Sequence, residues 1–585
     1  MIEKRRLVFR HYLALGLFVC LLLSPGRASL PPIDRDEPRY MQATSQMLKT
    51  GNFIDVRFQD QPRYLQPAGI YWLEAASVTL FGTPGAREPW VFRLPSLAGA
   101  VAATLLTAWI GSMLFGATAG LGAGLLLGTS VLLGFGSRLA TIDATMLPVI
   151  LLAQAMLLRI YLTHGPFARR DPLMAPTAAG PPVPERISLG ADGADGSGVG
   201  IAGRGTALLF WAALGVGLML KGPVILLVAG GTVLGLMIAD RRGGWLRHLH
   251  ARWGVLVMLA IVLPWCIGIA TVSGGTFFTD AIGKNFLGKV ANGQQAHGLP
   301  PGYYLLAFGL TFWPGTLFAV PAIPFAWSRR RTVELRFLLA WILPTWLVFE
   351  LVQTKLPHYV LPTYPAIACI VAAALVFGAR STRGIWVWLT RANTVIWGLL
   401  ALGLVLAGPI LLWRLEGRFA PLPVLIGIVV LFLCAATLRF VARHKPEGAV
   451  ACAAVAALLL QFDVFGLVLP QLHSIWLSPR IVTAVATVKP CPDSVVASAS
   501  FSEPSLVFLL GQQTRLINPV QSAEFLLSEP HCNLALIDRR QQTEFLSRMA
   551  TANVKALPLA EVKGLNYSTG QRLDLILYGG PKENP

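Results

Sequence analysis

The amino-acid sequence predicts a polytopic α-helical membrane protein with a small α/β domain at its C-terminal end. Three observations support this fold class: the composition, the spacing of the basic residues, and a change in character after residue 470. Of the 585 residues, 54% are hydrophobic and only 13% are charged, and the mean hydropathy is +0.61. Because a soluble domain carries about 25% charged residues, this chain has about half the usual supply for a surface in contact with water.

Many apolar segments reach the ~20 residues that a helix needs to cross the hydrocarbon core of a bilayer. Hydropathy predicts about thirteen such helices within residues 1–470. The first follows a basic N-terminal end and has the position of a signal peptide, but we favour a retained anchor because no small-x-small cleavage pattern follows it. The predicted segments are 7–23, 91–110, 119–136, 144–162, 206–220, 223–239, 254–272, 303–327, 335–351, 359–378, 394–412, 422–440 and 448–470.

The basic residues recur in short clusters between the apolar segments, as Lys and Arg do in cytoplasmic loops. A cytoplasmic N-terminus places every cluster inside, together with a Gly-, Pro- and Ala-rich linker at about 164–205. The polar loops 25–87 and 273–302 and the tail then lie outside, which is the periplasm for a protein of the bacterial inner membrane. The net charge of +19 therefore reports topology and does not indicate a nucleic-acid partner. The clusters are Lys4-Arg5-Arg6, Arg169-Arg170, Arg241-Arg242, Arg329-Arg330-Arg331 and Arg443-His444-Lys445.

The tail, residues 471–585, is predicted to be a separate periplasmic α/β domain. Short β-type runs at 494–497, 534–537 and 573–577 alternate with helical patterns at 503–510 and 541–549, which is typical of a mixed α/β domain. Two of the seven cysteines, Cys491 and Cys532, lie in this tail. In an oxidising compartment we expect these two to form a disulfide.

The outer loop 25–87 carries the first candidate site, an acidic and basic cluster directly after the first helix. Asp36 and Glu37 could accept a proton from an attacking hydroxyl or stabilise positive charge on a sugar. Arg39 offers a planar fork suited to phosphate oxygens, and Tyr40 follows it. The alternative is ordinary capping of a helix that begins near Pro38.

Further polar residues stand at other outer turns. Asp143 opens a helix that re-enters the membrane, so a catalytic role again competes with capping, and Arg138 precedes it. An ionised group near the hydrocarbon usually faces a cavity or a partner. Lys and Tyr at such turns also serve as interfacial anchors, and a lone His is usually structural. The basic and aromatic candidates for binding a phosphate or sugar are Lys221, His297, Lys355, His358 and Tyr359.

Several of these motifs, in this order, resemble one family of membrane enzymes. The pattern Asp36-Glu37-x-Arg39-Tyr40 is followed by Arg63-Tyr64-Leu65-Gln66-Pro67 and Tyr71-Trp72, then by Lys221-Gly222-Pro223 and the stretch from Lys355 to Pro362. Together they look like the bacterial aminoarabinose (lipid A) transferases and the protein mannosyltransferase superfamily. These are glycosyltransferases with the GT-C fold.

The resemblance implies transfer of a sugar from a polyprenyl-phosphate carrier to lipid A, another envelope glycan, or protein. It implies no nucleotide-sugar and no required metal or other cofactor; a divalent metal stays open, although no convincing ligand spacing occurs in the chain. By position, Asp36 resembles the main catalytic carboxylate and Asp143 the second outer acidic residue. Arg39 and the group Lys355, His358 and Tyr359 resemble residues near the carrier phosphate.

One departure from the family pattern concerns the carrier phosphate. Relatives commonly place a Lys where this chain has Gln66, and an uncharged donor forms a hydrogen bond about half as strong as a charged one. We expect Arg63 or Lys221 to compensate for that loss.

Two other functions are consistent with the same residues. A polytopic transporter or flippase of envelope lipids would use Asp463, which lies in the segment 448–470, as a coupling site. We favour instead a hydrogen bond between helices for the polar pair Gln461 and Asp463. A non-catalytic assembly protein with a degenerate site would explain the Leu65-Gln66 pair.

Overall fold

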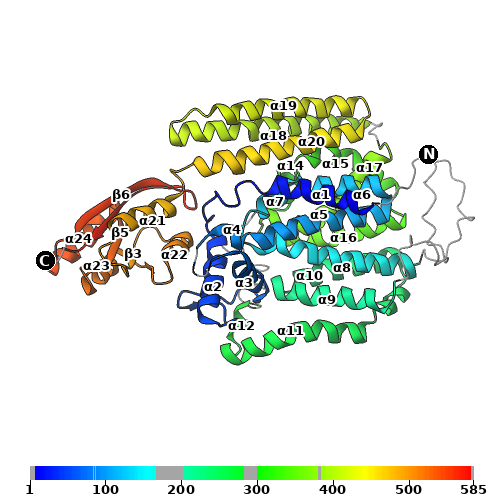
Figure 1. Ribbon diagram of the computed structural model, residues 1–585. Coiled ribbons are helices and arrows are strands. Elements are labelled where there is room, and N and C mark those ends of the chain that lie inside the picture. Colours follow the sequence, from blue (N-terminus) through cyan, green and yellow to red (C-terminus); the bar gives the residue numbers. More distant parts are fainter. Residues whose placement is uncertain are drawn as a thin grey trace, which may run out of the picture.

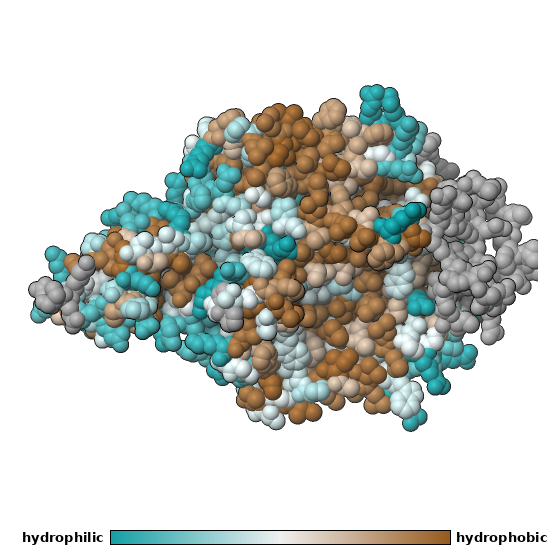
Figure 2. Space-filling view, in the orientation of Figure 1, coloured by the Kyte–Doolittle hydropathy of each residue, from teal (hydrophilic) through white to brown (hydrophobic). Residues whose placement is uncertain are grey.

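The computed structural model describes residues 7–83, 85, 87–166, 202–281, 283, 299–379 and 384–581. Two parts follow one another along the long axis of the molecule: a bundle of nearly parallel helices and, beyond one end of it, the C-terminal domain (Figure 1). Short helices of the first outer loop lie between the two parts. On the face shown in Figure 2, hydrophobic residues form a broad band across the bundle, and hydrophilic residues cover much of the C-terminal domain.

Every apolar segment predicted from the sequence coincides with at least one helix of this bundle. The helices are α1 (Phe9–Leu23), α5 (Leu94–Phe115), α6 (Ala117–Gly128), α7 (Val131–Gly136), α8 (Ile142–His164), α9 (Arg204–Lys221), α10 (Val224–Asp240), α11 (Ala251–Ser273), α14 (Tyr303–Thr311), α15 (Ala319–Ser328), α16 (Val333–Leu351), α17 (Tyr364–Val376), α18 (Gly384–Glu416), α19 (Pro421–Ala442) and α20 (Pro446–Gln461).

Fewer helices are long enough to cross a membrane than the sequence predicts. Within the described ranges eight qualify by length and composition, and a ninth if α14 and α15 count as one bent span. The helices α1, α6 and α10 are apolar but have only 15, 12 and 17 residues, which is short for a hydrocarbon core about 30 Å thick.

The predicted single segment 303–327 is bent by 116°. The bend falls at Pro314, which lacks a backbone N–H to continue a helix. A short 3-10 turn (Gly315–Phe318) follows before α15 begins.

The first outer loop folds into α2 (Glu37–Thr50), a two-stranded hairpin of β1 (Arg57–Phe58) and β2 (Gln61–Pro62), α3 (Gly69–Phe81) and α4 (Pro89–Phe92). Pro38 stands in the first turn of α2, and Gly51 ends that helix in the left-handed conformation. Gly69 allows α3 to touch the end of α9, because a Cβ there would lie 2.5 Å from the carbonyl oxygen of Met219. This contact brings the outer loop against the membrane helices.

The C-terminal domain is a five-stranded mixed sheet with helices, in the strand order β4-β3-β5-β7-β6. The strands β3 and β5 pair in parallel, whereas β5, β7 and β6 pair antiparallel. The predicted α/β character is confirmed. The sequence analysis did not identify β4, β6, α21 or α23. The elements are α21 (Leu477–Val488), β3 (Val496–Ser498), α22 (Pro504–Leu510), β4 (Arg515–Leu516), α23 (Pro519–Ser528), β5 (Leu534–Asp538), α24 (Gln542–Thr551), β6 (Leu557–Asn566) and β7 (Gln571–Gly579).

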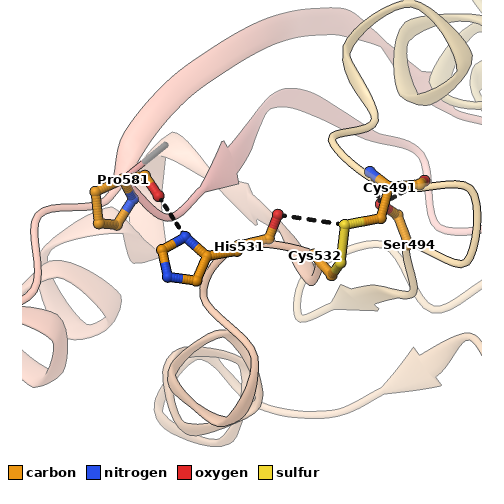
Figure 3. The surroundings of a disulfide bond; sticks show 5 residues. All are labelled: Cys491, Ser494, His531, Cys532 and Pro581. Atoms are coloured by element: carbon orange, nitrogen blue, oxygen red, sulfur yellow. Dashed lines mark hydrogen bonds between the residues drawn. A yellow bond between two sulfur atoms is a disulfide. The ribbon is translucent and has the colours of Figure 1, made fainter. Parts of the chain in front are cut away.

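A disulfide joins Cys491 and Cys532, whose Cα atoms are 5.3 Å apart (Figure 3). It ties the loop before β3 to the turn before β5, at the end where the two parallel strands begin. The five other cysteines are free thiols.

We expect loss of this disulfide to destabilise the C-terminal domain. The bond closes a loop with a sequence separation of 41 residues, and a cross-link of that length stabilises a fold by about 2–4 kcal/mol. Chemical denaturation of the wild type and of Cys491→Ser/Cys532→Ser would measure the loss. Cys452→Ser, which alters a free thiol in the membrane bundle, is the control and should leave the unfolding of this domain unchanged.

Candidate active site

The first cluster of candidate residues lies at the start of α2. Asp36 occupies the N-cap position of that helix, yet its side chain makes no capping hydrogen bond. Its carboxylate is 69% exposed and lies 3.8 Å from the guanidinium of Arg39. The capping alternative therefore does not describe this side chain, and the carboxylate remains accessible to solvent.

A hydrogen-bonded network of aromatic and basic side chains lies beside Asp36. The hydroxyl of Tyr71 accepts from Nε of Arg63 at 3.0 Å and from Nε2 of Gln66 at 3.2 Å. The Arg63 guanidinium lies 5.1 Å from the centre of the Tyr40 ring, and the Tyr40 and Tyr71 rings are 5.6 Å apart. Gln66 thus has a defined place within the network.

The two arginines of this region repel one another. Burial lowers the pKa of Arg39, and the charge of Arg63 lowers it further. Burial raises the pKa of the Tyr40 and Tyr71 hydroxyls, so both remain protonated donors at neutral pH. The cluster is therefore rich in donors and in positive charge, which suits an anionic ligand.

The second cluster joins three membrane helices through Asp143, in the first turn of α8. Its carboxylate forms an ion pair with Lys221 at the end of α9. Nε2 of His358, in the 3-10 helix Pro357–Thr363 before α17, lies 3.7 Å from the other carboxylate oxygen. The Lys221 ammonium is 5.8 Å from the centre of the Tyr359 ring. Residues far apart in sequence thus meet at one place.

Tyr359 belongs to the second cluster, and its hydroxyl lies within electrostatic range of both Asp143 and Asp36. The contact of Gly69 with Met219, two residues before Lys221, holds α3 beside the same point. The two clusters therefore form one site at the end of the bundle next to the C-terminal domain (Figure 1). It combines two carboxylates with the cations Arg39, Arg63 and Lys221.

Comparison with known proteins gives the fold a precedent. The structure superposes on ArnT from Cupriavidus metallidurans bound to undecaprenyl phosphate with a TM-score of 0.72, at 19% identity and over 98% of both chains. For the apo state of the same protein the TM-score is 0.70. The chain has the fold of ArnT. The predicted GT-C fold of a multi-pass membrane protein is thereby confirmed.

Two relatives with sequence similarity carry the same name. An undecaprenyl phosphate-alpha-4-amino-4-deoxy-L-arabinose arabinosyl transferase from Yersinia pestis (strain Pestoides F) is 24% identical over 357 residues, which are 60% of this chain and 56% of that protein. The enzyme of the same name from Enterobacter sp. (strain 638) is 26% identical over 345 residues, 58% of this chain and 54% of that protein. The matches thus span little more than half of these relatives' length. No protein-family model matches the chain.

Glu37 is buried, and hydrogen bonds hold its carboxylate in place. Its side chain is 1% exposed and accepts two hydrogen bonds from Arg93, at 2.7 and 2.8 Å. The backbone N–H groups of Ile33 and Ala140 donate to the same carboxylate, each at 2.8 Å. Because its oxygens are fully used in this way, we assign Glu37 the task of fixing the loop, and Asp36 is the carboxylate that faces outward.

Arg138 is likewise buried away from the two clusters. It donates to the carbonyl oxygens of Leu22, Pro25 and Gly134 and to Oε1 of Gln461. Gln461 in turn donates to the carbonyl oxygen of Thr129. The expected hydrogen bond between helices is therefore present at Gln461, and Arg138 connects α1, α7 and α20.

Two further predicted residues lie elsewhere or outside the described residues. Lys355 is 3% exposed, and its ammonium donates to the carbonyl oxygen of Val352 at 2.6 Å, close to the end of α16. His297 lies outside the residues that the structure describes.

Sequence reasoning missed the importance of Tyr71 and Arg93. Tyr71 is the common acceptor for Arg63 and Gln66, although it was noted only as part of a motif. Arg93 lies inside a predicted membrane segment, and that position was the available signal. A charged residue there is costly unless a partner faces it, and Glu37 is that partner.

A metal centre finds no support in the described part of the chain. No group of three or more His, Cys, Asp or Glu side chains there is placed to hold a metal ion. The charged side chains of the two clusters are instead arranged as carboxylates and cations that face one another.

Proposed function

We propose that this protein is an integral-membrane glycosyltransferase that moves a sugar from a polyprenyl-phosphate carrier to an acceptor of the cell envelope. The observation that carries the proposal is the convergence of the cations Arg39, Arg63 and Lys221 on the carboxylates Asp36 and Asp143. A lipid phosphate between the two arginines would relieve their repulsion. The ArnT-like fold and the donor in the relatives' names agree with this carrier.

The proposed reaction is a single inverting displacement. An acceptor oxygen forms a bond to the anomeric carbon while the bond from that carbon to the carrier-phosphate oxygen breaks. Polyprenyl phosphate leaves with the electron pair, and Arg39 and Lys221 stabilise its negative charge. If the acceptor is a hydroxyl, Asp36 takes its proton; if it is a phosphate of lipid A, Asp36 orients it or stabilises charge on the sugar.

Tyr359 and Gln66 complete the proposed binding site for the sugar and its phosphate. Tyr359 lies beside Lys221, whose ammonium is 5.8 Å from the centre of its ring, and can donate a hydrogen bond or pack against a sugar ring. Gln66 already donates to Tyr71, so Arg63 supplies the positive charge beside it. Relatives commonly place a Lys at the position of Gln66. We propose that Arg63 and Lys221 supply its positive charge to the carrier phosphate in this chain.

The proposed orientation places this site in the periplasm. The site lies at the end of the bundle next to the C-terminal domain (Figure 1). That domain contains the disulfide, and disulfides persist in oxidising compartments such as the periplasm. The basic clusters predicted for the cytoplasm fit the same orientation in a bacterial inner membrane.

Mass spectrometry of lipid A and surface glycans tests the proposal directly. We expect a deletion strain to lose the mass of a single sugar from one glycolipid, and the wild-type gene to restore it. The mass names the sugar and the acceptor. An unchanged envelope profile together with a change in protein glycosylation would move the acceptor to protein. An unchanged profile in both would contradict the proposed transferase and favour a transporter or an assembly protein.

We expect Arg39→Gln to weaken binding of undecaprenyl phosphate by about 10-fold or more. A hydrogen bond to a charged group contributes about 1.5–3 kcal/mol, and Arg39 is half-buried beside a second arginine. Titration of the purified protein with undecaprenyl phosphate measures the change. Arg572→Gln, an exposed arginine of the C-terminal domain, is the control. Equal affinity of Arg39→Gln and the control would contradict the phosphate-binding role.

A further inference from the structure

The C-terminal domain forms hydrogen bonds with the two residues directly before Asp36. The Asp34 carboxylate accepts from the backbone N–H of Ser505 at 2.9 Å and from its hydroxyl at 2.6 Å. The backbone N–H of Asp34 donates to the Tyr567 hydroxyl at 2.7 Å. Arg35 donates to the carbonyl oxygen of Ser568 at 2.8 Å. Two consecutive residues of the outer loop are thus held by two elements of the other domain.

The membrane bundle holds the same segment from its other side. The Glu37 carboxylate binds the backbone N–H of Ile33 and is itself fixed by Arg93. Asp36 therefore lies in a short stretch with Asp34 bound to the C-terminal domain at one end and Glu37 bound to the bundle at the other. Among the described residues, its exposed side chain forms one ion pair, with Arg39 at 3.8 Å, and no capping hydrogen bond, so its position depends mainly on the backbone that carries it.

We propose that Asp34 is a positioning residue through which the C-terminal domain holds the backbone of Asp36 in its reactive place. The inference rests on the proposed function for its effect on transfer. The C-terminal domain is then a working part of the site, although Asp34 itself need not touch the substrate. Misplacing a reacting group by about 1 Å can cost about 10²-fold in rate, so a loose segment should slow the reaction.

The domain has other contacts that keep it docked when the Asp34 contact is lost. Gln59 donates to the carbonyl oxygens of Gln512 and Thr514. Arg87 donates to the carbonyl oxygen of Phe508, and the rings of Phe508 and Phe92 pack edge to face at 5.6 Å. Removing the Asp34 side chain should therefore loosen one segment without releasing the domain.

The Asp34 contact should also depend on pH. Burial and the charges of Glu503 and Glu37 raise the pKa of Asp34 to about 7, against the hydrogen bonds from Ser505. Arg39 is a cation within electrostatic range of Asp34, and Tyr567 is the neutral donor. An acid whose folded pKa lies above its ordinary value of about 3.9 loses stabilisation as pH rises between those values. Docking of this segment against the C-terminal domain is therefore less favourable at pH 8 than at pH 5.5, because burial of the ionised carboxylate outweighs its hydrogen bonds from Ser505.

Hydrogen exchange and transfer rates in the full-length protein test the proposal together. We expect Asp34→Ala to lose amide protection over residues 33–40 and to slow transfer by about 10-fold or more, and to weaken binding of undecaprenyl phosphate by less than it slows transfer. Asp34→Asn can still accept from the Ser505 N–H and can donate to its hydroxyl, so it should retain protection and remove the pH dependence between pH 5.5 and 8. Ser505→Ala, which removes one donor, should show a smaller loss than Asp34→Ala.

Gln59→Ala is the matched control. It removes hydrogen bonds from the same interface between the outer loop and the C-terminal domain, near the other end of α2. It should change transfer by less than about twofold and leave residues 33–40 protected. Wild-type protection and rate in Asp34→Ala would overturn the proposal, as would equal losses in Gln59→Ala. If the wild type transfers no sugar from any polyprenyl-phosphate donor, the proposed function fails, and the exchange comparison still decides whether Asp34 orders this segment. Should Asp34→Ala not fold, Ser505→Ala serves for the same comparison.

Discussion

Asp36→Asn should lower the rate of sugar transfer by about 10²-fold or more, because general acid–base groups contribute about 10²–10⁴-fold to catalysis. Asn keeps the size of the side chain but has neither the charge nor the ability to take a proton. Asp36 makes no capping hydrogen bond and is largely exposed, so the fold should not depend on it. The measurement is transfer by purified protein, with binding of undecaprenyl phosphate determined in parallel.

The matched control for Asp36→Asn is Asp493→Asn, which changes an exposed carboxylate of the C-terminal domain in the same way. It should leave the rate unchanged. Wild-type transfer by Asp36→Asn at equal expression would remove the catalytic role of Asp36. It would also favour the alternative that the protein is a transporter, for which Asp463 is the candidate coupling residue. That residue is 2% exposed, and its Oδ1 has no hydrogen-bond partner among the described residues.

Arg93→Met should have the largest effect on stability, with an expected loss of about 3–5 kcal/mol in the free energy of unfolding. Arg93 is 0% exposed, and Glu37 is 1% exposed. The Arg93 guanidinium also donates to the carbonyl oxygens of Arg27, Leu30 and Pro31. Without Arg93, the buried Glu37 carboxylate has no cation and three carbonyl groups lose their donor. Denaturant titration of the protein in detergent micelles would measure the change.

A second substitution separates the ion pair from the packing. In the double variant Glu37→Gln/Arg93→Met no unpaired charge is buried, so it should be less destabilised than Arg93→Met alone. Arg439→Met, which alters an exposed arginine near the end of α19, should leave stability nearly unchanged. A loss below about 1 kcal/mol in Arg93→Met would contradict the importance that we give to this pair.

Much of the candidate site could be anticipated from its residue types and their positions at outer turns. Asp36, Asp143, Lys221 and His358 were each identified next to the end of an apolar segment, where side chains from different helices can converge. Their partnership could not be predicted. Asp143 and Lys221 are 78 positions apart in sequence, and hydropathy orders helices along the chain without specifying which of them touch.

Because a sequence pattern does not specify which side chains touch, the structure indicates other roles for Glu37 and Arg138 than the sequence predicts. Glu37 adjoins Asp36, and a sequence pattern treats two neighbouring carboxylates alike. In the folded chain Asp36 precedes the first helical residue and faces outward, whereas Glu37 begins α2 and points into the bundle toward Arg93. The guanidinium of Arg138 could bind a phosphate, but in the folded chain it donates to backbone carbonyl oxygens of Leu22 and Pro25.

The sequence alone determined that this protein is a helical membrane protein with an α/β tail, because hydrophobic length, charge spacing and strand patterns are local properties of the chain. It also determined which polar residues stand next to the ends of the apolar segments. Only the tertiary structure decided which carboxylate is exposed, which cations surround it, and that the C-terminal domain binds the segment of Asp36 through Asp34. These contacts join residues up to 533 positions apart, and the free energy of such contacts depends on burial and direction, which a linear pattern does not contain.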